Sequence, residues 1–378
     1  MKGNMRFCVP CLFGVEGLVA QELRDMGLEQ VQAENGRVLF SGGWEAMVRA
    51  NLCGRFGERV LLLLGEFPAR SFEELFQGVK ALPWEGLLGK EDAFPVTGSS
   101  LSSQLHSVPD CQAIIKKAIV ERLKAKYKLS WFAESGALHR VRFRILKDQV
   151  SVMVDTSGEG LHKRGYRALS NDAPMKETLA ASLCQLSRLR QDGHLIDPFC
   201  GSGTILIEGA LLARNIAPGL GRAFTAESWG SVPGQLWQQE RERARSLERR
   251  DTGFTAQGFD LDPAAVELTL ANAQKAGVED CITASVRDVR DFTQEGPYGC
   301  VVCNPPYGER LLDVRQAQEL YRALGQVFQP RRGWSLGVIS PDPEFESLFG
   351  RKADKRRKLY NGMIQCQYYQ YFRGSDKR

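Results

Sequence analysis

Long apolar runs are missing from this sequence of 378 residues. A helix that crosses a membrane needs about eighteen consecutive apolar residues, whereas the longest candidates here, such as residues 60–65, have the length of a strand. Residues 1–10 also lack the apolar core of a secretory signal peptide. We therefore expect a protein that has no membrane partner and is not exported.

Histidine is scarce, with four residues in the chain, and the ten cysteines lack the spacing of a disulfide framework. The pairs Cys8/Cys11 and Cys300/Cys303 have a spacing seen in zinc sites, but no histidine cluster accompanies them. Cys300 and Cys303 also belong to a predicted strand, where an odd separation points side chains to opposite faces. We expect no metal site, and the reduced thiols of a cytoplasmic protein.

A strong charge imbalance is absent as well, because the formal net charge is only +5. The content of 43% hydrophobic and 25% charged residues is typical of a soluble globular enzyme, and the length predicts two or three domains. Residues 1–65 carry the mixed signals of a small α+β domain, and residues 66–160 have the most uneven charge. Residues 161–378 alternate strand and helix signals, which predicts a doubly wound, mostly parallel α/β sheet. Within this last segment, the densely charged residues 235–251 predict an exposed helix on an insertion.

The basic residues of the second segment are concentrated between residues 116 and 147, where ten lysines and arginines accompany two acidic residues. Residues 110–128 predict a helix with lysines on its outer face. Residues 140–145 alternate strictly, so that Arg140, Arg142 and Arg144 share one face of a strand. Two neighbouring basic elements favour a contact with the phosphate backbone of a nucleic acid, although a solvated surface is the alternative.

Residues 195–204 predict a strand, a glycine turn and the start of a helix. In an open α/β sheet, ligands bind beyond the carboxyl ends of the strands, where glycines let a ligand approach the backbone. Asp197 at the start of the turn suits a positively charged amine, and the turn lacks the Gly-Lys-Ser/Thr ending of a phosphate loop. A purely structural turn is nearly as good an interpretation of this motif alone.

Two further strands are predicted to end at carboxylates. Asp260 closes one strand and can accept hydrogen bonds from both hydroxyls of a ribose, whereas Asp262 before Pro263 is better explained as a helix cap. Asp288 follows the next predicted strand and could accept from an adenine amino group, or be an exposed loop residue.

The apolar strand at residues 301–303 leads into Asn304, Pro305, Pro306 and Tyr307. The exocyclic amine of a base is a poor nucleophile because its lone pair is delocalised into the ring. The Asn304 side-chain oxygen and the Pro305 carbonyl can accept the two amine hydrogens, which localises the lone pair. Consecutive prolines fix the backbone and offer no competing N–H group, and Tyr307 offers a ring face on which a base can stack.

These motifs resemble a known family. Asp-Pro-Phe-Cys-Gly-Ser-Gly-Thr at residues 197–204, followed by Asn-Pro-Pro-Tyr-Gly-Glu-Arg at residues 304–310, is similar to amino-methyltransferases that use S-adenosylmethionine. Residues 161–167, 173–181, 217–229 and 360–362 extend the resemblance to the THUMP-domain RNA methyltransferases, in particular the bacterial large-subunit ribosomal RNA guanine-N2 methyltransferases. Met175 departs from the commoner leucine, and we expect no fused second methyltransferase domain.

The resemblance implies a ferredoxin-like domain at residues 1–65, a THUMP RNA-binding domain at residues 66–160, and a Rossmann-like class I methyltransferase domain at residues 161–378. It implies methyl transfer to an exocyclic base amine, most simply guanine N2 of 23S ribosomal RNA. The expected catalytic residues are Asn304, Pro305, Pro306 and Tyr307. The expected contacts to S-adenosylmethionine are Asp197, Phe199, Cys200, Gly201, Gly203, Thr204, Asp260, Leu261 and Asp288. The expected contacts to RNA are Arg140, Arg142, Arg144, Lys163, Arg164 and Arg167.

Three alternatives remain open at this point. Asn-Pro-Pro-Tyr serves several base amines, so a DNA adenine-N6 methyltransferase is one, and a transfer RNA guanine-N2 methyltransferase is another. A catalytically silent RNA-binding assembly factor is the third, and the intact cofactor acids and Asn304 argue against it.

Overall fold

The computed structural model describes residues 4–167, 175–307, 314–328 and 332–372. The protein divides into two compact units, and neither is continuous in sequence. The first unit combines Met1–Cys11, Val19–Leu161 and Ala223–Glu242. The second combines Leu12–Leu18, His162–Arg222 and Arg243–Arg378. No helix in the described ranges is long and apolar enough to cross a membrane.

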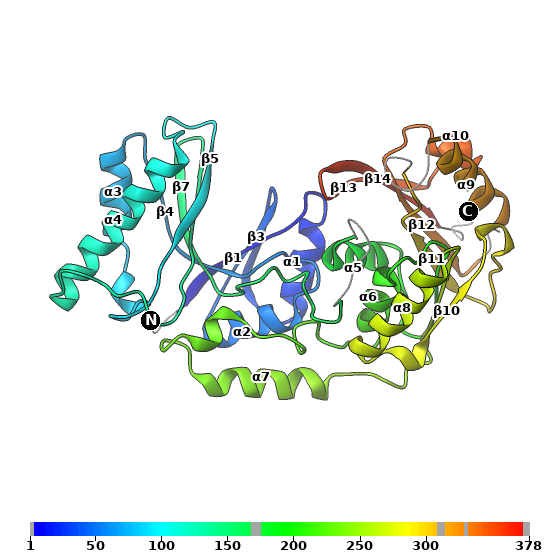
Figure 1. Cartoon of the computed structure of the whole chain (residues 1–378), viewed down its shortest axis with the longest axis horizontal. Helices are drawn as coiled ribbons and strands as arrows, with labels where there is room; N and C mark the ends of the chain where they lie inside the picture. The colour runs from blue at the N-terminus through cyan, green and yellow to red at the C-terminus, as the bar shows by residue number, and fades with distance from the viewer. Residues whose placement is uncertain (1–3, 168–174, 308–313, 329–331, 373–378) are drawn as a thin grey trace. The chain divides into compact units, whose positions relative to one another are not determined.

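Among the described residues of the first unit, seven strands form one sheet in the order β2-β3-β1-β4-β7-β6-β5 (Figure 1). The strands are β1 (Met5–Pro10), β2 (Glu29–Glu34), β3 (Arg37–Gly42), β4 (Leu61–Pro68), β5 (Val96–Leu101), β6 (Val141–Leu146) and β7 (Gln149–Asp155). Neighbouring strands are antiparallel, except that β5 and β6 are parallel. Because β4 runs across the predicted domain limit at residues 65/66, the sheet continues through that limit without a break.

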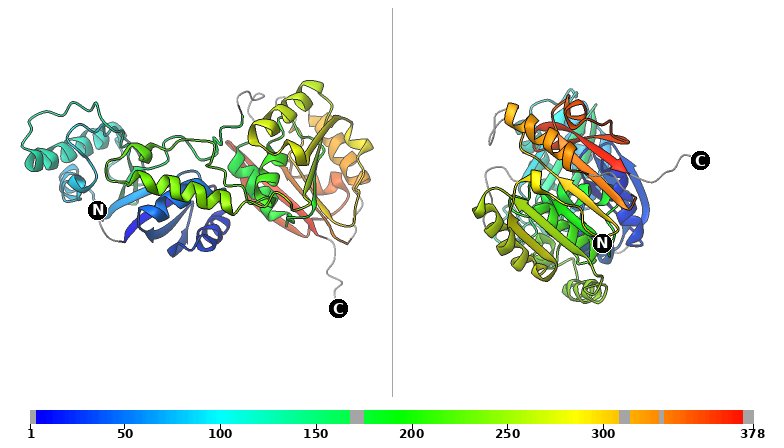
Figure 2. Two further views of the ribbon diagram at one scale, coloured as in Figure 1. Left: turned by 90° about the horizontal axis from the view of Figure 1, so that it is seen from below. Right: turned by 90° about the vertical axis from the view of Figure 1, so that its right-hand side faces the viewer.

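The helices α1 (Glu16–Asp25), α2 (Trp44–Cys53), α3 (Phe72–Lys80) and α4 (Val108–Tyr127) accompany these strands, and α3 lies beside α4 (Figure 2). The helix α3 begins at a capping box in which the Ser71 hydroxyl accepts from the Glu74 N–H. The predicted alternation of β6 is confirmed, because its apolar side chains are buried and Arg142 and Arg144 are half-buried on the other face. Sequence periodicity therefore places the arginines on one face correctly.

A segment from the second half of the chain, Ala223–Glu242, belongs to the first unit. The Trp229 indole stacks on the His139 imidazole with 4.4 Å between ring centroids, and its Nε1–H donates to the Leu138 carbonyl at 2.9 Å. Within α7 (Gly234–Ser246), Trp237 and Glu240 are buried, and Glu240 accepts from Arg49 of α2 at 2.8 Å. The prediction of a simply exposed helix at residues 235–251 is thus wrong, because one face of α7 is buried.

The described residues of the second unit also form a seven-stranded sheet, in the order β10-β9-β8-β11-β12-β14-β13. The strands are β8 (His194–Asp197), β9 (Thr255–Asp260), β10 (Ile282–Val286), β11 (Gly299–Cys303), β12 (Trp334–Ser340), β13 (Lys355–Asn361) and β14 (Ile364–Phe372). The first five strands in the sheet order are parallel to one another, and β14 is antiparallel to both of its neighbours, β12 and β13. The strand order reverses at β8, between β9 and β11, which is where open α/β sheets bind ligands at the carboxyl ends of their strands.

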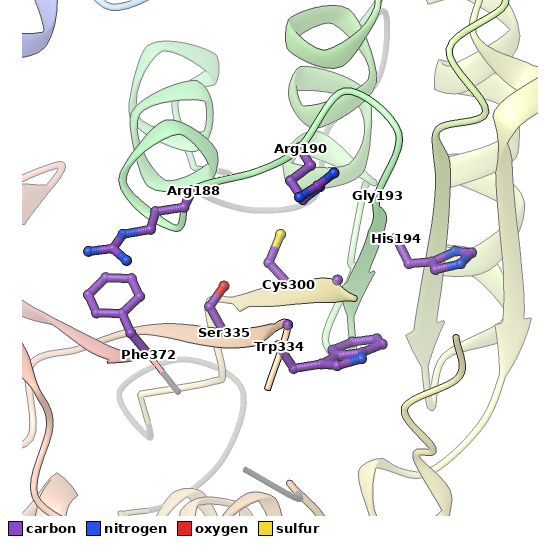
Figure 3. Close-up of a pocket in the computed structure, with 10 residues that line it drawn as sticks. Arg188, Arg190, Gly193, His194, Cys300, Trp334, Ser335 and Phe372 are labelled. Carbon is purple, nitrogen blue, oxygen red and sulfur yellow. The ribbon is translucent and has the colours of Figure 1, made fainter. Parts of the chain in front are cut away.

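The opposite, amino edge of this sheet contains a pocket of about 160 Å³ (Figure 3). Its floor includes Cys300 and Ser335 near the starts of β11 and β12, and Arg188 and Arg190 stand on its rim. The Arg188 guanidinium lies over the Phe372 ring at 4.1 Å, and Arg190 pairs with Asp192 at 3.0 Å. None of the residues predicted to bind a cofactor or a base lines this pocket.

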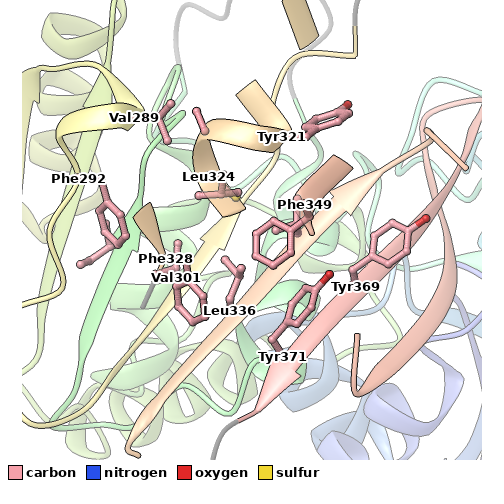
Figure 4. Close-up of a cluster of buried hydrophobic side chains, with 14 of the residues drawn as sticks. Val289, Phe292, Val301, Tyr321, Leu324, Phe328, Leu336, Phe349, Tyr369 and Tyr371 are labelled. Carbon is pink, nitrogen blue, oxygen red and sulfur yellow. The ribbon is translucent and has the colours of Figure 1, made fainter. Parts of the chain in front are cut away.

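Helices cover both faces of the second sheet. The helices α5 (Glu177–Leu186), α6 (Thr204–Ala213) and α8 (Pro263–Ala276) lie on one face (Figure 1). The helices α9 (Val314–Val327) and α10 (Phe345–Phe349) cover the other face over a core rich in aromatic side chains (Figure 4). This core joins Val301 of β11 and Leu336 of β12 to Tyr321 and Leu324 of α9, so it supports the strand that leads into Asn304.

Candidate functional site

The predicted site residues of the second unit lie at the carboxyl edge of its sheet. Asp197 ends β8, Asp260 ends β9, Asp288 follows β10 and Asn304 follows β11. These four strands are neighbours and parallel, so their carboxyl ends share one edge. The topology thus brings together side chains from four separate stretches of sequence.

Two glycines shape the turn between β8 and α6. Gly201 has a φ of 52° and Gly203 a φ of 78°, a region that glycine adopts without strain. A Cβ on Gly203 would lie 2.8 Å from the Thr269 side chain, whereas a Cβ on Gly201 would meet nothing within 4 Å. The Thr269 hydroxyl donates to the Gly201 carbonyl at 2.8 Å, and Asn272 donates to the Ser202 carbonyl at 3.0 Å. The turn is therefore held from α8 and leaves open space at Gly201.

Asp260 connects this turn with the start of α8. One carboxylate oxygen accepts from the Gly201 N–H at 2.9 Å, and the other accepts from the Asp262 N–H at 3.0 Å. Asp262 caps α8 by accepting from the Ala264 N–H at 2.9 Å, which confirms its predicted role as a helix cap. Each oxygen of Asp260 keeps lone-pair capacity for a further donor.

Apolar side chains stand exposed beside Asp260. Leu261 is 62% exposed, and Val286, which pairs in register with Asp260, is 54% exposed. Leu261 was singled out in the sequence, but Val286 was missed, because an apolar residue at the end of a strand carries no signal of exposure. A carboxylate, an open glycine turn and two exposed apolar side chains fit a cofactor that contains a ribose and an adenine.

Asp197 is buried, with 1% of its surface exposed, and accepts from the Phe199 N–H at 3.1 Å. Burial, with a smaller contribution from the neighbouring Asp260 and against the opposing effect of the Phe199 hydrogen bond, raises the pKa of this carboxyl to about 8. A cationic group bound beside Asp197 would stabilise the charged form of the carboxyl. The position of Asp197 therefore suits an ammonium ligand.

Asp288 caps a short helical turn, because its side chain accepts from the Arg290 N–H at 2.8 Å. Its other oxygen pairs with the Arg290 guanidinium at 2.8 Å. This carboxylate therefore lies at the same edge of the sheet as Asp197 and Asp260 and has partners of its own in the chain.

Asn304 is oriented by a chain of hydrogen bonds. The Tyr307 hydroxyl donates to the Asn304 side-chain oxygen and accepts from Asn361 Nδ2 at 3.2 Å. The Cys366 thiol lies 3.8 Å from the same hydroxyl, and burial raises the pKa of Tyr307 well above its usual value. Asn361 was not assigned a role in the sequence, although it lies in one of the motifs that carry the family resemblance. The hairpin of β13 and β14 thus helps to position the Asn-Pro-Pro-Tyr segment.

The arginines of the first unit differ in availability. Arg142 donates to Asp155 at 2.9 Å, and this fully buried carboxylate also pairs with Arg59 at 2.8 Å. Arg140 is exposed, and Arg144 has no hydrogen-bond or ion-pair partner within the described ranges. Of the three predicted arginines, Arg140 and Arg144 therefore keep their guanidinium groups without an ionic partner among the described residues.

The basic residues that precede α5 need a correction. Arg164 is buried and pairs with the buried Glu208 of α6 at 3.3 Å, so it does not face an RNA. Arg167 pairs with Glu177 and donates to the Met175 carbonyl at 3.2 Å. Lys163 is exposed. The sequence did contain one indication that Arg164 is buried. Glu208 is the lone glutamate within the apolar helix α6, and a buried charge requires a partner of opposite sign.

No group of three or more histidine, cysteine, aspartate or glutamate side chains that could hold a metal lies among the described residues. All ten cysteines are free thiols, and nine of them are buried.

Comparison with protein families places the three parts of the chain. The model described as "RMKL-like, methyltransferase domain" matches residues 164–370, which is more than half of the chain. The chain belongs to the RlmKL-like methyltransferase family. Models described as "RlmL ferredoxin-like domain" and "THUMP domain" match residues 6–61 and 69–155. The predicted fold class, a Rossmann-like class I methyltransferase domain after ferredoxin-like and THUMP modules, is confirmed.

Two curated relatives illustrate the range of this family. "Putative RNA methyltransferase YpsC" of Bacillus subtilis (strain 168) is 44% identical over 361 residues, covering 95% of this chain and 94% of the relative. "Ribosomal RNA large subunit methyltransferase K/L" of Psychromonas ingrahamii is 35% identical over 384 residues. That alignment covers 99% of this chain and 51% of the relative, so this RlmKL-like chain spans about half of the larger protein.

Two solved structures are similar over almost the whole chain. "SMU.472, a putative methyltransferase complexed with SAH" is 42% identical with a TM-score of 0.93 and covers 100% of both chains. "A predicted N6-adenine-specific DNA methylase from Listeria monocytogenes str. 4b F2365" is 44% identical with a TM-score of 0.93, covering 98% of this chain and 97% of the other.

Proposed function

We propose that this RlmKL-like protein transfers a methyl group from S-adenosylmethionine to guanine N2 of large-subunit ribosomal RNA. The observation that carries the proposal is the position of Asn304 and Pro305 at the carboxyl end of β11, beside the carboxyl end of β8. The name of the K/L relative and the THUMP match support RNA as the substrate.

The residues at the edge of the sheet provide each contact that the cofactor needs. Asp197 would hold the ammonium group, Asp260 the ribose hydroxyls, and Leu261 with Val286 the adenine. Asp288 is the candidate partner of the adenine amino group. Phe199, Cys200, Gly201, Gly203 and Thr204 form the turn that approaches the cofactor. When bound, S-adenosylmethionine supplies a methyl group on a sulfonium, which is a strong electrophile.

Asn304 and Pro305 prepare the nucleophile. The Asn304 oxygen and the Pro305 carbonyl accept the two hydrogens of the base amine, so that the amine lone pair points toward the incoming methyl group. The bond from nitrogen to the methyl carbon forms as the bond from sulfur to that carbon breaks. The nitrogen is then cationic and loses one proton to water, so no strong base is needed.

Tyr307 and Pro306 complete the receiving side. A side-chain carbonyl oxygen has two lone pairs, so Asn304 can accept from the Tyr307 hydroxyl and from the base amine together. The Tyr307 ring offers a face for the base, and the Pro306 carbonyl accepts from the Tyr321 hydroxyl at 3.4 Å, which steadies the segment.

RNA contacts in this proposal come from Arg140, Arg144 and Lys163. We assign the ferredoxin-like part to residues 1–65, the THUMP part to residues 66–160 and the methyltransferase part to residues 161–378. The buried free thiols support a reducing, cytoplasmic location.

A DNA adenine-N6 methyltransferase is the second candidate. The name of the Listeria relative favours it, and Asn-Pro-Pro-Tyr can accept the hydrogens of an adenine amine equally well. The basic surface of the THUMP part argues for RNA. A transfer RNA substrate would use the same chemistry.

Mass spectrometry of nucleosides from cells with and without the gene tests the proposal. We expect the loss of N2-methylguanosine from large-subunit ribosomal RNA. Loss of N6-methyladenine from DNA, or of N2-methylguanosine from transfer RNA alone, would replace the proposal with one of its rivals.

Replacing Asn304 by alanine tests the chemical step. Single-turnover methyl transfer should fall about 10²–10³-fold, as for the loss of one group that stabilises developing charge. Titration calorimetry should show nearly unchanged cofactor affinity. A collapse of cofactor affinity with normal transfer in the residual complex would contradict the assigned role.

A further inference from the structure

Trp131 is the exception among the six tryptophans of the chain. Its side chain is 74% exposed, whereas Trp44, Trp84, Trp229, Trp237 and Trp334 are between 0% and 9% exposed. An isolated exposed tryptophan leaves a large apolar ring in water without a packing partner, and such residues are enriched where a partner molecule binds. Trp131 therefore marks a contact surface.

The backbone on each side of Trp131 is anchored. Lys128 ends α4 in the left-handed conformation with a φ of 58°, and its N–H donates to the Lys124 carbonyl at 3.0 Å. On the other side, Phe132 is buried and meets the Phe94 ring edge-on, with 6.3 Å between centroids. Only residues 129–131 lie between these two anchors. The indole thus lies on a short, exposed segment between two anchored positions.

The end of α4 before Trp131 is rich in lysine, with Lys124, Lys126 and Lys128. Three acidic side chains that contact α4 or lie on it form ion pairs, because Glu85 pairs with Arg122, Glu121 with Lys124 and Glu134 with Lys116. Lys126 and Lys128 are exposed, and neither forms an ion pair among the residues that the structure describes. An exposed aromatic ring that follows exposed lysines in the chain matches the composition of single-stranded nucleic-acid sites, where the ring stacks on a base and lysines contact phosphates.

We propose that Trp131, with Lys126 and Lys128, binds an unpaired nucleotide of the RNA substrate by stacking on its base. The inference rests on the proposed RNA function and adds to it that the first unit binds a single-stranded part of the RNA. Stacking needs an exposed base face, so a blunt duplex cannot occupy this surface in the same way. The lysines contact the adjoining phosphates without reading the sequence.

The part of the intrinsic fluorescence that acrylamide can quench reports on this surface, because the other five tryptophans are buried. We expect a ten-nucleotide single-stranded RNA to quench the fluorescence of the full-length protein and to protect it from acrylamide. A blunt RNA duplex of the same length should bind through its phosphates with little quenching. The Trp131→Phe variant should lose the quenchable signal.

Affinity measurements on variants separate stacking from general hydrophobic contact. Trp131→Ala and Trp131→Leu should each weaken binding of the single-stranded RNA by roughly 5- to 150-fold, the range for loss of one stacked base. Trp131→Phe, which retains an aromatic face, should stay within about threefold of the wild type. Phe13→Ala is the matched control, since Phe13 is an exposed aromatic residue (59%) outside this surface.

The outcomes are distinct. Wild-type RNA affinity in Trp131→Ala overturns the stacking role but leaves the proposed function standing. Failure of the wild-type protein to bind or methylate any RNA overturns the proposed function itself. A blue shift of the Trp131 signal with anionic lipid vesicles and none with RNA would assign the surface to a membrane and overturn the inference.

Discussion

Asn304 shows at the scale of one residue how a side-chain oxygen can be kept in place for catalysis. Its amide would rotate freely if the backbone alone held it, yet the Tyr307 hydroxyl donates to its oxygen and Asn361 secures that hydroxyl from β13. The amide plane is therefore set before the base arrives. Preorganised acceptors act without reorganisation during the reaction, which is a main source of catalytic advantage.

Tyr307→Phe tests this orientation, because it removes the hydroxyl and retains the ring face. We expect single-turnover methyl transfer to fall about tenfold, corresponding to about one hydrogen bond at the reacting group. Cofactor affinity should not change. Asn361→Ala should cause a smaller fall in the same rate, and a normal rate in both variants would show that Asn304 is oriented by other contacts.

The pH dependence of cofactor binding tests Asp197. Since the pKa of its carboxyl is about 8 and a bound ammonium group favours the charged form, cofactor binding should release a proton. Affinity should therefore rise with pH, by up to about tenfold per unit between pH 6 and 7.5, and level off above pH 8. Calorimetry in buffers of different ionisation enthalpy measures the released proton. Asp197→Asn should bind more weakly with no such slope, and a pH-independent wild-type affinity would contradict the assignment.

At the scale of a single element, the strand β6 has two arginines that share one face and differ in their contacts. Arg142 is a partner of the buried Asp155, whereas Arg144 has no ionic partner in the described structure. Replacing Arg142 by glutamine should lower the free energy of unfolding by about 1–3 kcal/mol, since it removes a hydrogen bond between charged groups.

Replacing Arg144 by glutamine should leave stability nearly unchanged and flatten the slope of log RNA affinity against log salt by about one phosphate contact. The reverse assignment would appear as a stability loss for Arg144→Gln.

Sequence patterns predicted helices and strands well where the signal comes from residues that are close together in the chain. The alternation of β6, the cap at Asp262 and the strand before Asn304 all depend on neighbouring residues, and each is present. Contacts between distant residues carry no such signal. Arg164 seemed to belong to a basic surface because its partner Glu208 lies 44 positions away, and α7 seemed solvated because Arg49, the partner of its Glu240, lies in α2.

At the scale of the whole molecule, the sheet of the first unit includes strands from residues 1–65 and from residues 66–160, which the composition of the sequence had assigned to two separate domains. The strand β4 spans the gap between the ferredoxin-like match, which ends at residue 61, and the THUMP match, which begins at residue 69. It pairs with β1 on one side and β7 on the other. The same unit is completed by Ala223–Glu242 from the other half of the chain. The position of Asp197, Asp260, Asp288 and Asn304 at one sheet edge, in contrast, was predictable, because the carboxyl ends of parallel strands share one edge. Val286 and Asn361 carried no such signal.

Trp229→Ala in the full-length protein measures what this returning segment contributes. The variant loses the stack on His139 and the hydrogen bond to Leu138, and we expect the free energy of unfolding of the first unit to fall by about 3–5 kcal/mol. Urea unfolding followed by circular dichroism measures the change. Trp229→Phe should recover most of it, and an unchanged unfolding curve for the alanine variant would show that the segment adds no stability.

The returning segment also determines when the first unit can be finished on the ribosome. Its main part ends at Leu161, but its last piece ends at Glu242, about 80 residues later. At a synthesis rate of roughly 5–20 residues per second, the nascent chain waits about 4–16 seconds with the sites for Trp229 and Glu240 open. During that interval β8, the first strand of the second sheet along the chain, is already synthesised. The strands of the first sheet are all made by then, but the first unit is completed only after the second sheet has begun.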